Sequence, residues 1–444
     1  MIKSHPWSTA AACALALAAL TCRAHADDIK YRSFSASAAI GPPAEAFAAK
    51  LATVTATALG DAGAVHFVKL AGTPAIAPQF GGSIVAAVAA GEAGGGFDAA
   101  YISGSDLNRT WGFLFNSGIP LGPTFDEFSG FLYGQSMTSA SDPAHPRSAL
   151  DRVQELELAR GVMAIPIVGS PEQLSGYFLE PMGDVPGRAG IGLAGLCEQH
   201  WALRYLPPGE NAIGLACDRL VAEGKIGKKN LTFVEAVPGN GSLVAAIAAG
   251  QIQGFEFATP LDDLSQLFGG KDNPGTLGLR YVHTPGWQQQ FLLTWMIVNQ
   301  QRWDALGPGR QALIQSVARD HVISSYAENL RQQGAALATL LATNRGADRM
   351  VPTRWPMRDL ARLSQATIQF LNDRVVDPSL PAADRADYAR FLAALRAYVR
   401  ANDRYWEQRE VDPKLRSEDL ERWTGAAGAC REDPCETRRP EADR

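Results

Sequence analysis

The sequence of 444 residues lacks the short motifs that mark common hydrolases and metal sites. It has no Gly-x-Ser-x-Gly turn for a serine nucleophile, no His-Glu-x-x-His zinc helix and no calcium-loop pattern. Its histidines are scattered, and none forms a pair at the spacing of metal ligands. The glycine cluster of Gly187, Gly190 and Gly192 follows no clear strand, so a loop is a better interpretation than a nucleotide site. An enzyme is therefore the least supported class of protein.

The chain also lacks long apolar runs and an excess of basic side chains. No segment offers the roughly 20 apolar residues in a row that a membrane-spanning helix needs, so we expect a chain that does not span a membrane. With 41 Lys and Arg against 46 Asp and Glu, the formal net charge is −5. The basic footprint of a nucleic-acid-binding protein is therefore absent.

The N-terminus predicts export. Ala10–Leu20 is an apolar run of the length found in signal peptides; Lys3 precedes it, and Ala24-His25-Ala26 supplies a small-x-small cleavage site. We expect residues 1–26 to be a signal peptide that is removed after Ala26, which would deliver the protein to the periplasm. Cys22 raises the alternative of a lipid anchor, although Ala19-Leu20-Thr21 before it is a poor lipidation context.

Cysteine is scarce, with six in the whole chain. Cys197, Cys217, Cys430 and Cys435 remain after signal-peptide removal. In an oxidising compartment they could pair locally, as 197 with 217 and 430 with 435, or stay free thiols. Zinc is the competing interpretation, but neither pair has the two-residue spacing of a metal knuckle.

What the chain does contain is a repeat. Ser83–Gly91 and Ser242–Gly250 are nearly the same, and each soon leads to a Phe-acid pair, Phe97-Asp98 and Phe255-Glu256. Each copy predicts a short helix of small residues that ends at a glycine and is followed by a short apolar strand. One such unit in each half of the chain predicts two similar α/β lobes that face each other across a cleft. Coincidence is the alternative, because Ala and Gly are abundant.

Strands and helices alternate from the start of the mature chain, with strands predicted over 29–38 and 65–70. This alternation predicts a largely parallel sheet covered on both faces. Ligands in such sheets bind at the carboxyl ends of strands. Tyr101, Ser103 and Ser105 follow the third predicted strand, so we expect them at the cleft; the serines could instead cap the next helix.

Two charged residues are embedded in apolar sequence. Arg204 follows Leu203 and precedes a Pro-Pro-Gly stop, and a guanidinium is the side chain best suited to hold a carboxylate through two hydrogen bonds. An exposed edge position or a structural ion pair remains the alternative for Arg204. Glu256 lies between apolar residues and needs a cation, either a basic side chain or a hard metal ion.

These residues lie in segments that resemble a known family. Pro166–Phe178 resembles the Pro-x-Gly-x-x-x-Gln-x-Gly-Gly-Trp-Phe stretch of TRAP transporter solute-binding proteins, the periplasmic receptors of tripartite ATP-independent transporters. The other matching segments are Leu203–Gly209, Gly250–Leu264, Tyr281–Trp287 and Val298–Leu306. They agree in order and approximate spacing, over roughly residues 29 to 410. The resemblance is to the branch that binds 2-oxo acids and other small organic acids.

The resemblance implies roles for particular residues. Arg204 would clamp the ligand carboxylate, and Tyr101 would reach in from the other lobe. Gln173, the Glu256 side chain and the main-chain carbonyl of Phe257 would hold a Na⁺ or Ca²⁺ ion that bridges to the ligand. The protein would then deliver a small organic acid to membrane permease subunits. A ligand-sensing partner of a signalling receptor, with the same fold and site, is the alternative that the sequence leaves open.

The chain departs from the family pattern near this predicted site. Tyr177 and Phe257 replace tryptophans, and Arg204 is one residue further from its proline than usual. About ten extra residues lie in each of the stretches 179 to 203 and 210 to 240. These departures leave the identity of the acid open.

The predicted fold is α/β, a two-lobe periplasmic binding protein with a ligand cleft between the lobes and a long helix, after Pro308, that packs across both. The expected organisation is a signal peptide at 1–26, lobe I at 27–163 and 254–297, lobe II at 164–253, lobe II with C-terminal helices at 298–424, and a disordered tail at 425–444. Hinges are expected near Ala164, Gly254 and Val298, and ligand binding is expected to close the cleft.

Overall fold

The structure is a computed structural model that describes residues 28–34, 41–71, 75–134, 136–139, 142–203, 207–234, 242–256, 259–265, 278–343 and 350–407. The chain divides into two compact units, one up to Leu392 and one from Ala393. The first unit contains both large sheets and all of the predicted site residues. The predicted signal peptide, the predicted tail and the cysteines at 430 and 435 lie outside the described residues.

The first sheet has the strand order β2-β1-β3-β12-β6. Its strands are β1 (Asp28–Ser33), β2 (His66–Lys69), β3 (Ala99–Ser103), β6 (Val162–Pro171) and β12 (Phe291–Asn299). β1 is parallel to β2 and β3, whereas β12 is antiparallel to both β3 and β6. Every residue of β6 and β12 is buried, which agrees with the predicted coverage of both faces.

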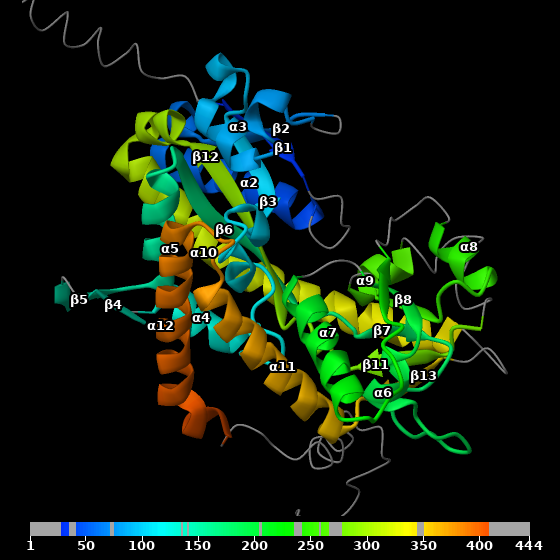
Figure 1. Ribbon diagram of the computed structural model, residues 1–444. Coiled ribbons are helices and arrows are strands. Elements are labelled where there is room, and N and C mark those ends of the chain that lie inside the picture. The colour runs from blue at the N-terminus through cyan, green and yellow to red at the C-terminus, as the bar shows by residue number, and fades with distance from the viewer. Residues whose placement is uncertain are drawn as a thin grey trace, which may run out of the picture. The chain divides into compact units, whose positions relative to one another are not determined.

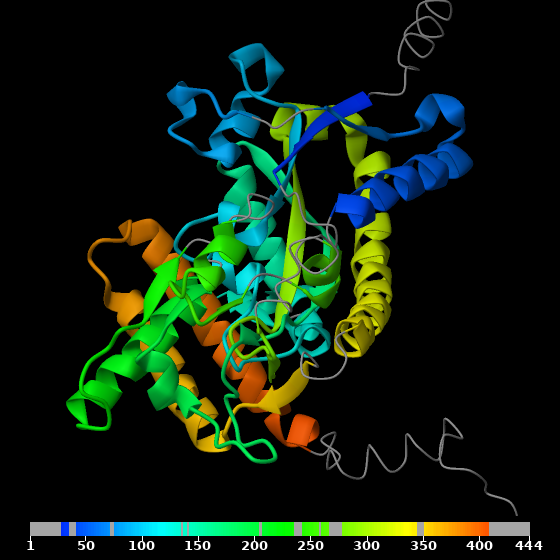
Figure 2. The same cartoon turned by 90° about the vertical axis from the view of Figure 1, so that its right-hand side faces the viewer.

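Helices α2 (Gly41–Leu59) and α10 (Gln300–Thr343) lie against this sheet and against each other (Figures 1 and 2). Their apolar side chains share one core with the strands, which includes Tyr31, Phe47 and Trp303. The short helix α3 (Ile84–Ala90) is the first copy of the repeat. The Ser83 hydroxyl caps it by accepting from the Ala86 N–H at 3.1 Å, and Gly91 ends it with a φ of 64°.

The second sheet has the strand order β13-β11-β7-β10-β8-β9. Its strands are β7 (Gly176–Phe178), β8 (His200–Leu203), β9 (Thr232–Val234), β10 (Gly254–Glu256), β11 (Tyr281–Thr284) and β13 (Val351–Arg354). The second copy of the repeat is helix α8 (Ser242–Ala248) followed by β10. The two copies thus contribute one helix-strand unit to each sheet, as the sequence predicts.

Helices α6 (Gly192–Cys197), α7 (Pro207–Ala222) and α11 (Met357–Val376) share an apolar core beside the second sheet. Cys197 and Cys217 form a disulfide that joins α6 to α7, which is one of the two local pairings that the sequence allowed beside free thiols. Both cysteines are completely buried.

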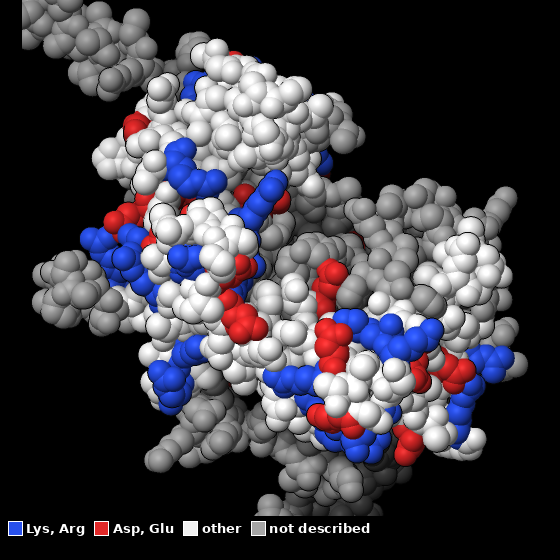
Figure 3. Space-filling model, viewed as in Figure 1, with Lys and Arg blue, Asp and Glu red and all other residues white. Residues whose placement is uncertain are grey.

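The remaining elements belong to neither large sheet. They are α4 (Phe125–Tyr133), α5 (Ala149–Leu158), α9 (Pro260–Asp263), α12 (Ala382–Glu407), the hairpin of β4 (Met137–Ser139) and β5 (Asp142–Arg147), and 3-10 turns at Asp61–Gly63, Pro78–Phe80, Glu92–Gly94, Gly104–Asp106 and Gly112–Phe115. None of the described helices is long and apolar enough to cross a membrane. On the face shown in Figure 3, basic and acidic side chains lie side by side over the described residues.

In the described part of the chain, the two sheets are connected through residues 172–175, residues 285–290 and helix α10. The expected hinges near Ala164, Gly254 and Val298 lie within strands and not in these connections. The assignment of 254–297 to the first lobe agrees with the position of β12 but not with β10 and β11, which belong to the second sheet, and β6, which was expected to enter lobe II at residue 164, belongs to the first sheet. Strand β6 continues through Pro166. Because β6 is an edge strand and its register with β12 shifts beside Pro166, the sheet tolerates the backbone N–H that proline lacks. Helix α10 reaches from the core of the first sheet to α9, as predicted, with a kink at Gly307.

Candidate functional site

Gln173 lies in the first connecting segment and is 1% exposed. The first connection contacts both β11 and the second connection: the Ser175 N–H donates to the His283 carbonyl at 3.0 Å, and Gln288 Nε2 donates to the Leu174 carbonyl at 2.8 Å. A Cβ at Gly286 would lie only 1.6 Å from the Gln173 carbonyl oxygen, so this approach requires glycine. The backbone around Gln173 is therefore packed closely against the second connecting segment.

Glu256 ends strand β10 and is 1% exposed. It pairs with Leu203 across the parallel ladder of β10 and β8. The carboxyl ends of two parallel strands meet at one edge of a sheet. Arg204 follows Leu203 in the sequence, and Phe257 follows Glu256; both lie outside the described residues. In the sequence, the predicted carboxylate clamp Arg204 and the predicted cation ligand Phe257 thus come directly after two paired strands, and the predicted ligand Glu256 is the last residue of one of them.

Gly176 connects the Gln173 segment with the Glu256 strand. Its φ is 122°, and a Cβ there would lie 2.4 Å from the Phe255 carbonyl oxygen. Only glycine accommodates both the backbone conformation and this close approach. The segment that holds Gln173 therefore runs directly against β10, and the structure brings the surroundings of two predicted ligands together.

Helix α9 contains further buried carboxylates. Asp262 and Asp263, its last two residues, are 2% and 1% exposed, and the Tyr177 hydroxyl donates to Asp263 Oδ2 at 2.8 Å. Burial, and then the negative charges of Asp263 and Glu256, raise the pKa of the Tyr177 hydroxyl well above its ordinary value. Tyr177 therefore remains a hydrogen-bond donor at any physiological pH. Asp262 and Asp263 are in the segment that resembles the family, but the sequence alone does not show that they are buried.

The oxygen atoms of the predicted site are of the kind that bind a hard cation. Carboxylate, amide and main-chain oxygens are the ligands that Na⁺ and Ca²⁺ take in proteins. Among the described residues, no group of three or more His, Cys, Asp and Glu side chains is placed to hold a metal ion. The predicted set contains only one such side chain, Glu256, with the Gln173 amide and a main-chain carbonyl.

The acidic residue of the first repeat copy has a structural role instead. Asp98 precedes strand β3, whereas Glu256 ends its strand. The Asp98 carboxylate accepts two hydrogen bonds from the Arg302 guanidinium, at 3.1 and 3.0 Å. The two Phe-acid pairs are therefore not equivalent in the fold.

Tyr101 lies in β3, in the core of the first sheet, and is completely buried. Its hydroxyl is 2.7 Å from Thr294 Oγ1, and burial raises its pKa above the ordinary value. The role of Tyr101 as a ligand contact stays a prediction. Ser103 caps the 3-10 turn at Gly104–Asp106, so the capping alternative is confirmed for this serine.

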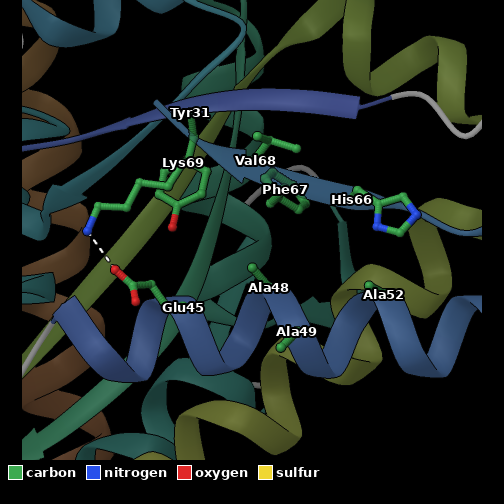
Figure 4. Close-up of a pocket in the computed structure, with 9 residues that line it drawn as sticks. All are labelled: Tyr31, Glu45, Ala48, Ala49, Ala52, His66, Phe67, Val68 and Lys69. Carbon is green, nitrogen blue, oxygen red and sulfur yellow. Dashed lines mark hydrogen bonds and ion pairs between the residues drawn. The ribbon is translucent and has the colours of Figure 1, made fainter. Parts of the chain in front are cut away.

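A pocket of about 310 Å³ lies elsewhere, between α2 and β2 (Figure 4). Alanines of α2 form its floor, and Lys69 in its wall is paired with Glu45 at 2.6 Å. None of the predicted site residues lines it. This pocket is a poor site for an anion, because its lysine already forms an ion pair with a carboxylate.

Solved structures with this architecture are known. A TRAP transporter solute-binding protein of Bordetella bronchiseptica, with calcium and picolinate bound, matches with a TM-score of 0.61 and 15% identity over 90% of this chain and 97% of its own. This chain has the fold of TRAP transporter solute-binding proteins. A TRAP protein of Colwellia psychrerythraea with bound calcium and pyruvate matches at a TM-score of 0.58 and 15% identity, over 86% of this chain and 99% of its own.

A third protein of this fold is a Bordetella pertussis extracytoplasmic solute receptor that binds pyroglutamic acid. Its TM-score is 0.52 and its identity 14%, over 84% of this chain and 100% of its own. No protein-family profile and no curated protein matches the sequence. The TRAP receptor fold confirms the predicted α/β class with two lobes and a long helix.

Proposed function

We propose that the protein is a periplasmic solute-binding receptor of a TRAP-type transporter. It captures a small organic acid between its lobes and delivers it to membrane permease subunits. The observation that supports this proposal is the pairing of Glu256 with Leu203 at the ends of two parallel strands, with Gly176 of the neighbouring segment packed against the Phe255 carbonyl. Proteins of this fold hold calcium or sodium together with small acids such as pyruvate.

In the proposed mechanism, the Arg204 guanidinium holds the ligand carboxylate through two parallel hydrogen bonds. Gln173 Oε1, the Glu256 carboxylate and the Phe257 carbonyl hold Na⁺ or Ca²⁺, which would neutralise part of the ligand's charge. Tyr101 contributes from the first lobe. The lobes close on the ligand by bending at 172–175 and 285–290, because the ligand contacts both lobes only in the closed state. No covalent chemistry is required.

A thermal-shift screen tests the proposed function. The mature protein would be measured with mono- and dicarboxylates, 2-oxo acids, aromatic acids, amino acids and sugars. We expect the unfolding temperature to rise with at least one carboxylate and not with uncharged sugars, because the proposed guanidinium clamp pairs with an anion. Stabilisation by a sugar alone would contradict the proposal.

A further inference from the structure

Gln288 lies in the second connecting segment and is 3% exposed. Its Nε2 donates to the Leu174 carbonyl, beside Gln173. On its other side it meets α7: a Cβ at Gly209, in the first turn of that helix, would lie 2.9 Å from Gln288 Cβ. Gln288 is thus placed between the Gln173 segment and the helix that follows Arg204.

The hydrogen bond to Leu174 fixes the orientation of the Gln288 amide. A carbonyl oxygen can only accept, so the nitrogen of the amide must face Leu174, and Oε1 must point elsewhere. Oε1 is buried, and within the described part of the chain no donor hydrogen-bonds to it. A buried acceptor without a donor is unfavourable, and such groups in native proteins call for a partner.

A neighbouring glutamine shows the contrast. Gln290 is in the same segment, but its Nε2 donates to the Gly286 and Trp287 carbonyls at 3.4 and 3.2 Å. Its amide therefore stabilises the turn of its own segment. Gln290 is only half-buried and its oxygen is not among the buried atoms without a partner.

We propose that Gln288 Oε1 accepts a hydrogen bond from a donor group on the ligand. The site then selects carboxylic acids that carry a hydroxyl or N–H group over the 2-oxo acids of the same carbon skeleton, because a ketone offers no proton. This inference rests on the proposed function and refines its ligand class. A buried water that satisfies Oε1 is the competing account, and it predicts no preference between such acids.

The experiment uses matched pairs of acids of increasing size. Dissociation constants of the wild-type protein would be measured for lactate and pyruvate, 2-hydroxyisocaproate and 2-oxoisocaproate, and mandelate and phenylglyoxylate. In the pair that fits the cleft, we expect the hydroxy acid to bind at least about tenfold more tightly than the oxo acid. This difference in affinity corresponds to one well-formed buried hydrogen bond. Replacing the hydroxyl by fluorine, as in 2-fluoropropanoate for lactate, should remove this advantage without any change in the protein.

Two variants complete the test. Gln288→Met keeps the length of the side chain but has no acceptor, so it should bring the hydroxy acid to the affinity of the oxo acid. Gln290→Met is the matched control and should keep the wild-type ratio. Equal wild-type affinities within the pair that binds would overturn the inference and leave the proposed function intact. Binding of no acid in any pair, together with no stabilisation by any carboxylate in the thermal-shift screen, would overturn both.

Discussion

The disulfide between α6 and α7 provides a prediction whose magnitude is set by the structure. Cys197 and Cys217 are separated by 20 residues and are completely buried in the core that α6, α7 and α11 share. Breaking the bond by reduction, or replacing both cysteines with alanine, releases α7 from α6 in the unfolded chain. The same helix begins immediately after the segment that contains Arg204.

The expected loss of stability comes from the entropy of the unfolded chain. A closed loop of this length restricts the unfolded ensemble by about 3 kcal/mol at 25 °C in the chain-entropy treatment. Cysteine to alanine replacement adds a smaller cost, because sulfur atoms are removed from a packed core. We therefore expect the free energy of unfolding to fall by about 3 kcal/mol on reduction.

Urea denaturation of the oxidised and the reduced protein measures this difference, and peptide mapping without reduction verifies the pairing. A matched variant in which Cys430 and Cys435 are replaced by alanine should keep wild-type stability, because the sequence predicts a disordered tail there. Identical denaturation curves for the oxidised and reduced protein would refute the reasoning.

Three further predictions concern the site and the fold. Glu256→Ala should abolish any dependence of ligand affinity on Na⁺ or Ca²⁺; an affinity unaffected by chelator in sodium-free buffer in the wild type would remove the cation from the mechanism. Burial lowers the pKa of His283 from 6.5 to about 3. Between pH 6.5 and pH 3, the unfolded chain therefore binds a proton at this histidine that the folded chain does not bind. The free energy of unfolding should fall as the pH drops from about 6.5 toward 3. That fall should be smaller in His283→Gln, and urea denaturation of both proteins at several pH values measures it; equal pH slopes would contradict this. Labels at Leu59 and Lys225, on different lobes, should approach each other when ligand is added, and an unchanged single-molecule distance at saturating ligand would argue against closure.

Local sequence signals predicted the helix-strand units well. Ser83 is a cap residue and Gly91 supplies the positive φ that ends the helix, so the first copy of the repeat could be identified from neighbouring residues alone. The sequence offered Cys217 as the nearby partner of Cys197, but it did not decide between a disulfide and free thiols.

Long-range pairing was not predictable in the same way. Strand β10 has three residues, and its membership in the second sheet depends on Tyr177, Phe178 and the β8 strand, all far away in sequence. A proline is unfavourable inside a strand when judged from local sequence, but Pro166 lies on an edge strand beside a register shift, which accommodates it. The hydroxyl of Tyr101 meets Thr294 across a distance of 193 residues in the chain, which no local pattern could show.

The central claim is that Arg204 holds the carboxylate of an organic acid. The most direct test is to measure the affinity of Arg204→Ala and Arg204→Lys for the carboxylate that stabilises the wild type most in the screen. Removing one partner of a buried charge pair costs about 3 to 5 kcal/mol, so Arg204→Ala should bind about two to three and a half decades more weakly, with an unchanged unfolding temperature when ligand-free. Arg204→Lys should also bind poorly, because an ammonium lacks the planar fork. An Arg204→Ala protein that binds the carboxylate as tightly as the wild type would contradict the account.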